Sequence, residues 1–394
     1  MTLMPTIFTD ARMVLPDRVL HGWLMITGDT ITGLGPGRPP DVSGTLVDLD
    51  GRYLAPGLVD IHCHGAAGAV VYSGSADDLA RVADAHLRRG TTTMLASVAT
   101  VASDLMLTAA AVIGEATRRG RSPNLAGLHL EGPFLSVVRR GAQVEDALRR
   151  PDPELAGELL AAAGELPIMM TIAPELDGAI ELISRYGDRC RFAIGHTDAS
   201  YQQVVAAVDA GARHVTHLFN GMAPLEHRNP GPVAAALTDR RMTYELIADG
   251  HHILPPVLAL AAEHDQGRRT VLVTDASIAA GLGDGHYAFA GRAVDVVGGA
   301  VRRADTGSLA GSTAFLLDCV RTMITEVGTG PVDAFRMATQ TSAAAAGLTG
   351  RGSLYPGCRA DLLILGPDLD LHDVYCGGVP TASPAITTTK EGYE

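Results

Sequence analysis

Lysine is almost absent from this sequence. The single lysine among 394 residues is Lys390, which lies within the last five positions of the chain. A Schiff-base lysine, a phosphate-loop lysine and a carboxylated lysine that bridges two metal ions are therefore excluded from the rest of the sequence. Any bridging anion in a metal site must come from another residue type.

Cysteine is scarce and poorly spaced for pairing. The cysteines lie far apart and form no CxxC pair. This distribution argues against a disulfide framework and against a cysteine-based zinc site. We expect five reduced, structural residues, namely Cys63, Cys190, Cys319, Cys358 and Cys376.

Long apolar runs and stripes of basic charge are also missing. No window reaches the roughly 18 uninterrupted apolar residues that a membrane helix needs, and the N-terminal stretch lacks the basic region and apolar core of a signal peptide. The formal net charge is −13 and arginine is scattered along the chain, so no stripe of charge matches a polyphosphate backbone. We therefore expect a cytoplasmic protein that has neither nucleic acid nor membrane as a partner.

The sequence does contain a repeated alternation of short apolar runs and helical segments. Each run is rich in β-branched residues, and each is followed by a stretch with helical period. The eight runs occupy residues 57–64, 91–98, 125–132, 167–174, 191–197, 214–220, 242–249 and 270–276. Eight strands that alternate with helices predict an α/β fold, a parallel (β/α)₈ TIM-like barrel over residues 56–349.

The two flanks of the predicted barrel have a different pattern. Residues 1–55 and 350–394 carry short strand-like runs separated by glycine and proline turns. We expect these flanks to build one small β-sandwich domain together. Residues 281–311 predict a hairpin that is inserted after the eighth barrel strand.

Residues of metal-binding type gather at the carboxyl ends of the predicted strands, where barrel enzymes carry their chemistry. They are His62, His64, Glu131, His196, His217 and Asp275. Side chains two apart on a strand share a face, so His62 and His64 can bind one ion while Cys63 points the other way. An isolated buried histidine is more often a hydrogen-bonded core residue, but the coincidence of so many strand ends favours a metal site.

The two carboxylates have different expected tasks. Gly132 and Pro133 turn the chain directly after Glu131, which aims this carboxylate into the barrel mouth as a candidate bridging ligand. Asp275 is the candidate general base, because water activated by a divalent ion needs a nearby carboxylate to take its proton and return it to a leaving amine. The alternatives are a loop cap at Glu131 and a helix cap at Asp275.

The remaining histidines divide into one candidate and a structural group. His252, at the end of the seventh strand, is a candidate for positioning a substrate carbonyl and is favoured over its neighbour His251. We expect structural or surface roles for His86, His129, His214, His227, His264 and His286. No serine or cysteine stands beside a base at a strand end, so a nucleophilic triad is not indicated.

With their surrounding motifs, these residues resemble the amidohydrolase superfamily and, within it, the N-acetylglucosamine-6-phosphate deacetylase family. The resemblance runs from about residue 50 to about residue 365, through segments such as APGLVDIHCHG, LHLEGPFLS, THLFNGMAPLEHRNPG and LVTDA. It implies hydrolysis of the N-acetyl amide of an amino-sugar 6-phosphate. It also implies Zn²⁺ or Fe²⁺ as cofactor, with one or two ions per subunit, and a homodimer.

The resemblance further implies a division of labour among the metal ligands. Glu131, His196 and His217 match the ligands of the ion that this family generally retains. His62 and His64 match the pair that supports a second ion in members that keep it. Asp275 matches the catalytic aspartate, which also binds that second ion.

Substrate contacts are implied in the same way. His252 matches the histidine on the carbonyl side, while Asn220, the backbone at Gly221 and Arg228 match positions that hold the sugar phosphate. Arginine suits this task because its planar fork gives two parallel charge-assisted hydrogen bonds. Gln143, in RRGAQ, stands where the family usually has a histidine that helps at the phosphate.

That departure leaves other substrates open. The same chemistry on N-acetylgalactosamine 6-phosphate, or on a non-phosphorylated N-acyl compound, is one alternative. A non-catalytic scaffold that acts by binding partners is another, and it is disfavoured because every metal-ligand position is filled.

Overall fold

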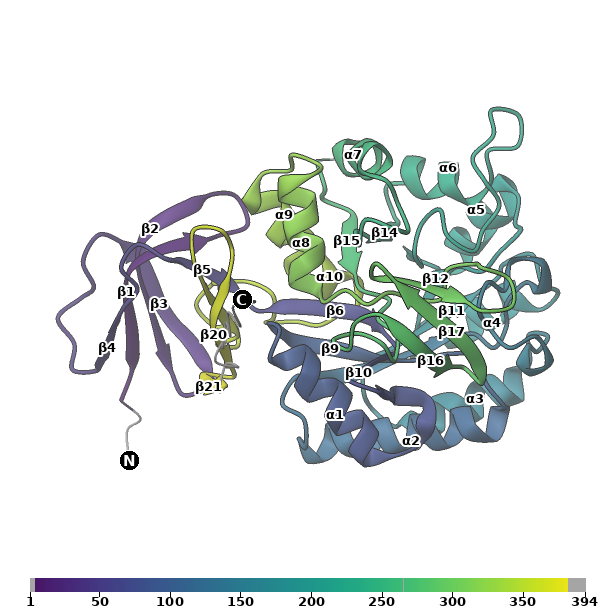
Figure 1. Ribbon diagram of the computed structural model, residues 1–394, viewed down its shortest axis with the longest axis horizontal. Helices are drawn as coiled ribbons and strands as arrows, with labels where there is room; N and C mark the ends of the chain where they lie inside the picture. Colours follow the sequence, from purple (N-terminus) through teal and green to yellow (C-terminus); the bar gives the residue numbers. More distant parts are fainter. Residues whose placement is uncertain (1–3, 265, 382–394) are drawn as a thin grey trace, which may run out of the picture.

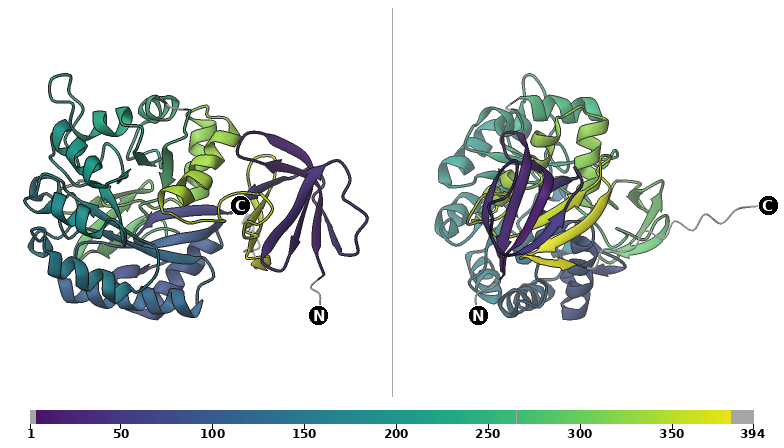
Figure 2. Two further views of the ribbon diagram at one scale, coloured as in Figure 1. Left: turned by 180° about the vertical axis from the view of Figure 1, so that it is seen from behind. Right: turned by 90° about the vertical axis from the view of Figure 1, so that its left-hand side faces the viewer.

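The computed structural model describes residues 4–264 and 266–381, which form two bodies of unequal size (Figure 1). The larger body is a barrel of parallel strands wrapped by helices. The smaller one is a sheet built from both ends of the chain; it lies beside the barrel in Figure 1 and in the left view of Figure 2, and in front of it in the right view. Within the described residues, no helix combines the length and the apolar character needed to cross a membrane.

The barrel contains the eight strands that the sequence predicts, in sequence order and all parallel. They are β6 (Leu58–Cys63), β9 (Thr91–Val98), β10 (Leu125–Glu131), β11 (Ile168–Ile172), β12 (Arg191–Ile194), β13 (His214–Val215), β14 (Thr243–Ile247) and β15 (Thr270–Val273). The first and last of them meet through a bridge between Cys63 and Ala276. A hydrogen bond of 2.9 Å from the amide of Asp275 to the carbonyl of His62 lies beside this bridge.

Helices cover the outside of the barrel, and several of them carry ordinary capping signals at their ends. They are α1 (Ala76–Leu87), α2 (Ser103–Arg119), α3 (Pro153–Ala163), α4 (Ala179–Tyr186), α5 (Tyr201–Ala210), α6 (Gly231–Thr238), α7 (Pro255–Glu263), α8 (Leu316–Thr325), α9 (Pro331–Met337) and α10 (Gln340–Ala345). At α5, the hydroxyl of Ser200 accepts from the amide of Gln203, and the Gln203 side chain accepts from the amide of Ser200. At α1, Ser75 caps a first turn that contains Asp77 and Asp78, which complement the helix dipole.

The smaller body confirms that the two flanks fold together. Its strands are β1 (Thr6–Val14), β2 (Val19–Thr27), β3 (Thr30–Pro36), β4 (Thr45–Asp48), β5 (Tyr53–Pro56), β19 (Leu362–Leu365), β20 (Leu371–Cys376) and β21 (Val379–Thr381). β5 and β19 pair antiparallel and so join the N-terminal and C-terminal parts. The sheet encloses an apolar cluster that includes Phe8, Leu24, Leu54 and Leu362. The rest of the expected second flank, residues 382–394, lies outside the described residues.

The insertion after the eighth strand has one strand more than the predicted hairpin. It consists of β16 (Gly285–Phe289), β17 (Arg292–Val297) and β18 (Ala300–Arg303) in an antiparallel sheet. Gly298 and Gly299 both have positive φ, at 58° and 82°. Two adjacent residues of this kind suit a tight hairpin turn, which accounts for the third strand.

Candidate metal centre and active site

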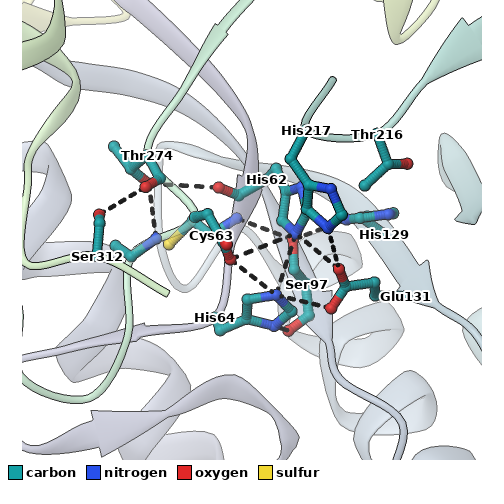
Figure 3. A network of polar contacts seen from close by, with 12 residues as sticks. His62, Cys63, His64, Ser97, His129, Glu131, Thr216, His217, Thr274 and Ser312 are labelled. Atoms are coloured by element: carbon teal, nitrogen blue, oxygen red, sulfur yellow. Dashed lines mark hydrogen bonds and ion pairs between the residues drawn. The ribbon is translucent and has the colours of Figure 1, made fainter. Parts of the chain in front are cut away.

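Four imidazoles converge on one buried carboxylate at the carboxyl ends of the barrel strands, as Figure 3 shows for three of them. The Nε2 atoms of His196 and His217 lie 2.9 and 3.1 Å from Oε1 of Glu131. The Nε2 atom of His62 lies 3.5 Å from the same oxygen. The Nε2 atom of His64 lies 3.2 Å from the other oxygen, Oε2.

The last predicted ligand reaches the same place from the eighth strand. Oδ1 of Asp275 lies 3.4 Å from Nε2 of His64 and 3.6 Å from Nε2 of His62. Its side chain is 13% exposed, more than those of the two histidines. The structure therefore brings together all the residues that the sequence predicts as metal ligands. Among His62, His64 and Asp275, the aspartate has the side chain that is most exposed to solvent.

Each of the four imidazoles is oriented by a hydrogen bond between its Nδ1 atom and a protein oxygen. The Nδ1 contacts join His62 to Oε2 of Glu245 (2.8 Å), His64 to the carbonyl of Ser97 (2.8 Å), His196 to the carbonyl of Arg139 (2.8 Å) and His217 to the carbonyl of Asn220 (3.1 Å). Carbonyl and carboxylate oxygens only accept hydrogen bonds, so Nδ1 carries the hydrogen in each ring. Neutral rings then present the Nε2 lone pair to the centre, which is the orientation that metal-binding histidines adopt.

The spacing of these nitrogens fits a metal site. The Nε2 atoms of His62 and His64 are 3.1 Å apart, and so are those of His196 and His217. Two lone pairs at this distance repel unless a proton or a cation lies between them. Nitrogen ligands of a tetrahedral zinc ion are about 3.3 Å apart, given bond lengths of about 2.05 Å. Glu131 belongs to both groups of donors, one with each histidine pair.

The charges at the centre are strongly coupled. Burial alone would lower the pKa of His62, but the carboxylates of Glu245, Asp275 and Glu131 raise it to about 10. Burial alone would raise the pKa of Glu131, but the neighbouring histidines, His196 above all, hold it well below the usual value. Without an ion, protons supply the positive charge that these carboxylates require. A metal ion would replace those protons, so we expect its binding to weaken at low pH.

A cavity of about 240 Å³ lies beside the ligands. The predicted substrate residues Asn220, Gly221, Gln143 and His252 all line it. Oδ2 of Asp249 accepts a hydrogen bond of 2.7 Å from Nδ1 of His252, which fixes a ring that is only 5% exposed.

Two other residues near the mouth remain apart from this cavity. His251 is exposed and does not line it, whereas His252 does; the role of His252 stays a prediction. Arg228 lies in the exposed segment before α6 and does not line the cavity within this chain. Its assignment to the sugar phosphate stays a prediction.

Gln143 has protein partners that the sequence does not reveal. The residue is 6% exposed. Its Oε1 accepts from the amide of Thr100 at 2.8 Å, and its side-chain amide donates to Oε2 of Glu131. One of its N–H groups is therefore directed at a metal-ligand candidate, and its expected contribution to phosphate recognition stays a prediction.

Several contributors to the site are missing from the sequence-based prediction. Glu245 holds His62, accepts from the amide of His217 at 2.9 Å and lies 3.1 Å from Nε2 of His214. The signal for it is an acidic residue inside the otherwise uncharged strand TYELI. The insertion adds Phe289 and residues 308–311 to the cavity wall, a contribution for which the sequence carries no spacing signal.

Three candidate ligands stand in a strained backbone conformation. The φ angles of His196, His217 and Asp275 are 46°, 28° and 47°. Each left-handed residue other than glycine costs on the order of 1–3 kcal/mol and persists only where its surroundings impose it. Such strain concentrates at functional sites, which agrees with the position of these residues at strand ends.

Comparison with known proteins gives a consistent result. The Amidohydrolase family matches residues 53–381. The sequence is 36% identical over 376 residues to an N-acetylgalactosamine-6-phosphate deacetylase of Escherichia coli O157:H7, covering 93% of this chain and 97% of that protein. It is 34% identical over 377 residues to an N-acetylglucosamine-6-phosphate deacetylase of Bacillus subtilis (strain 168), covering 94% and 95%.

Solved structures agree with these sequences. A mutant N-acetyl-D-glucosamine-6-phosphate deacetylase from Mycobacterium smegmatis, in complex with N-acetyl-D-glucosamine-6-phosphate, matches with a TM-score of 0.90 and 35% identity. The match covers 96% of this chain and 99% of that one. The deacetylase from Pasteurella multocida also gives a TM-score of 0.90, at 28% identity, with 96% and 100% covered.

Proposed function

Because the chain belongs to the amidohydrolase family and is a hydrolase of amide C–N bonds, we propose that it deacetylates N-acetyl-D-glucosamine 6-phosphate. The products are D-glucosamine 6-phosphate and acetate. The observation that carries the proposal is the convergence of four imidazoles and two carboxylates beside a cavity lined by Asn220, Gly221 and His252. Relatives with the same named activity support it over nearly the whole chain.

The ion is held, in this proposal, by the six predicted ligands. They are His62, His64, Glu131, His196, His217 and Asp275. When bound, the ion polarises the amide carbonyl and makes water a stronger nucleophile at neutral pH. The nitrogen and oxygen donors support Zn²⁺ or Fe²⁺, with one or two ions per subunit.

The protein's own groups then direct the reaction. Asp275 accepts a proton from the attacking water and delivers it to the amine nitrogen as the C–N bond breaks. His252, held by Asp249, presents its ring to the carbonyl side of the substrate. Asn220 and the backbone at Gly221 bind the sugar phosphate, and Arg228 adds a charge-assisted contact.

A direct assay tests this function. Protein purified without chelator is analysed for metal, and acetate release is measured from N-acetylglucosamine 6-phosphate and from the unphosphorylated sugar. Release confined to the phosphorylated sugar, with at least one ion per chain, supports the proposal. Bound metal without acetate release from either sugar would refute the proposed substrate. Less than one ion per chain together with no activity would favour the non-catalytic scaffold.

A second candidate substrate is N-acetylgalactosamine 6-phosphate. Two observations favour it, namely the 36% identical relative with that named substrate and the presence of glutamine at position 143. The two phosphorylated sugars differ in the orientation of one hydroxyl group. The ratio of their kcat/KM values decides between them.

We also propose a cytoplasmic homodimer in which residues 56–349 form the catalytic domain and residues 1–55 and 350–394 form the second. The family resemblance supports the dimer. Light scattering of the metal-loaded protein tests the oligomeric state. The phosphate role of Arg228 is tested by Arg228→Ala, which should abolish the preference for the phosphorylated sugar.

A further inference from the structure

A second cavity opens at the end of the barrel opposite the metal centre. Its volume is about 1000 Å³, against 240 Å³ for the cavity beside the metal ligands. Its wall is formed by the amino-terminal ends of β12 to β15, by α9 and α10, and by the turn between β1 and β2. Figure 1 shows this turn beside α9, where the terminal sheet meets the barrel.

Arginine dominates the wall of this cavity. Among the described residues, the positively charged ones that line it are Arg191, Arg213, Arg241, Arg268 and Arg336, and the negatively charged ones are Asp17 and Asp333. This excess of positive charge occurs in a chain whose formal net charge is −13. A cleft lined by one sign of charge concentrates its potential and attracts ions of the opposite sign.

Some of these arginines are satisfied by the protein itself. The contacts join Arg336 to Asp333 (2.7 Å) and to the carbonyl of Pro16 (3.2 Å), Arg241 to Asp209 (2.8 Å) and Asp239 (2.6 Å), and Arg213 to the carbonyls of Val208 (2.5 Å) and Ala212 (2.7 Å). These three residues shape the wall, and Arg336 also docks the β1–β2 turn against α9.

Two arginines are left without such contacts. Across residues 4–264 and 266–381, neither Arg191 nor Arg268 forms a hydrogen bond or ion pair through its side chain. The guanidinium of Arg191 nevertheless has a defined place. A Cβ at Gly347, whose φ is 71°, would lie 2.4 Å from Nε and 2.5 Å from Nη2 of Arg191. Gly347 itself lines a smaller neighbouring cavity that Arg191 also borders. Its bare backbone makes room for a guanidinium group that forms no ion pair within residues 4–264 and 266–381.

We propose that this cavity binds a small polyanion, a molecule with at least two phosphate or carboxylate groups, through Arg191 and Arg268. Guanidinium groups bind either anion by paired, charge-assisted hydrogen bonds. The volume lies at the upper end of the range of about 300–1,000 Å³ that is usual for small-molecule sites. Thr341 and Gln340 add neutral hydrogen-bonding groups to the same wall.

This site is separate from the deacetylase centre. It lies at the opposite ends of the strands that carry His196 and His217, and it shares no lining residue with the cavity beside the metal ligands. A ligand there contacts both the barrel and the turn containing Asp17, so it should favour the folded, docked state of the two bodies.

Calorimetry and thermal unfolding of the metal-loaded protein test the proposal. The probes are fructose 1,6-bisphosphate and succinate, which separate a phosphate from a carboxylate ligand. We expect at least one probe to bind and to raise the unfolding temperature. Arg191→Gln combined with Arg268→Gln should weaken that binding about tenfold or more, since two charged hydrogen-bond donors are lost.

The control is a double variant with the same change of charge. Arg121 and Arg150 are exposed and do not line the cavity, so Arg121→Gln with Arg150→Gln should bind the probe as the wild type does. Deacetylation without probe should be unchanged in both double variants.

Two results would overturn the proposal. One is a lack of binding of either probe at millimolar concentration. The other is equal binding by the wild type and the Arg191/Arg268 variant, which would place the probe elsewhere, including the substrate site. If the double variant fails to fold, Arg268→Glu alone, at an exposed position, should still weaken binding, and unaltered affinity would count against the site.

Discussion

The side-chain amide of Gln143 donates a hydrogen bond to Oε2 of Glu131, the carboxylate shared by both histidine pairs. Its orientation is fixed at the other end, because the amide of Thr100 can only donate and therefore faces Oε1 of Gln143. Gln143 thus borders the cavity of about 240 Å³ and the candidate metal ligands at once. A residue in this position can orient Glu131 and tune its affinity for an ion.

Replacing Gln143 by leucine should lower metal affinity about 10- to 100-fold, the usual effect of losing a partner of a metal ligand. Competition with a chromophoric chelator measures this affinity. Gln202→Leu, at an exposed position on α5, is the matched control and should have no effect. Unchanged metal affinity together with a raised KM for the phosphorylated sugar would instead assign Gln143 to the phosphate.

Asp275→Asn should reduce turnover by about 10²-fold or more, because proton transfer by a positioned group contributes that much. The amide keeps the shape of the side chain, and the remaining ligands should retain at least one ion. Asp295→Asn, at a side chain of the insertion that is 42% exposed, is the control. A variant of Asp275 with metal bound and near-normal kcat would contradict its role as the base.

Glu245→Gln should weaken metal binding about 10- to 100-fold although Glu245 touches no ion in our proposal. The change removes the negative charge that faces Nδ1 of His62 at 2.8 Å. Elemental analysis after dialysis gives the remaining metal content. Glu263→Gln, at the exposed end of α7, should leave it unchanged. Full retention of metal by Glu245→Gln would show that His62 needs no charged partner.

Removal of metal by a chelator should abolish deacetylation and lower the unfolding temperature. An ion that binds only the folded state adds about 2.7 kcal/mol to the free energy of unfolding at a free concentration 100 times its Kd. Activity and unfolding temperature should both return when Zn²⁺ or Fe²⁺ is restored. Full activity in protein shown to be metal-free would refute the proposed centre.

Acid should destabilise the fold through His86. Burial lowers the pKa of His86 to about 4, and its Nδ1 has no hydrogen-bond partner among the described residues. The pKa of this histidine in the unfolded chain is about 6.5, so the unfolded state binds the proton first as pH falls. Stability should therefore be lost from about pH 6.5 down to about pH 4, by up to about 3 kcal/mol.

His86→Gln should reduce this loss, since glutamine does not titrate. Urea unfolding at pH 7 and pH 5 measures the free energy of unfolding of both proteins. The wild type should lose more stability than the variant between the two values. An equal loss would mean that other groups govern the acid sensitivity.

The barrel strands, and the convergence of the candidate metal ligands at their ends, are predictable because both signals are local. Each apolar run occupies one stretch of sequence, and each candidate ligand lies at the end of such a run. Once the barrel topology is assumed, HxH in 57–64 and LHLEGP in 125–132 are therefore placed at the same end of the barrel. The partners of these ligands are not local. Glu245 and the carbonyl of Ser97 reach His62 and His64 across 183 and 33 residues.

The arginine-lined cavity illustrates the same limit. In the sequence, Arg191, Arg213, Arg241 and Arg268 look scattered, and their spacing carries no motif. Each lies at or just before the start of a barrel strand, and parallel closure brings all four starts to one end. Periodicity predicts the strands, whereas the charge that gathers at their ends depends on side-chain packing that periodicity does not encode.

The bridge between Cys63 and Ala276 determines when, during synthesis, the proposed metal centre can be completed. His62 and His64 are made early, whereas Asp275 follows more than half a chain later and on the other side of this seam. A nascent chain therefore carries an incomplete ligand set until its eighth strand has left the ribosome and joined the first. In the proposed centre, a complete ligand set marks a finished barrel, and chains truncated before residue 270 lack both Asp275 and the closing strand.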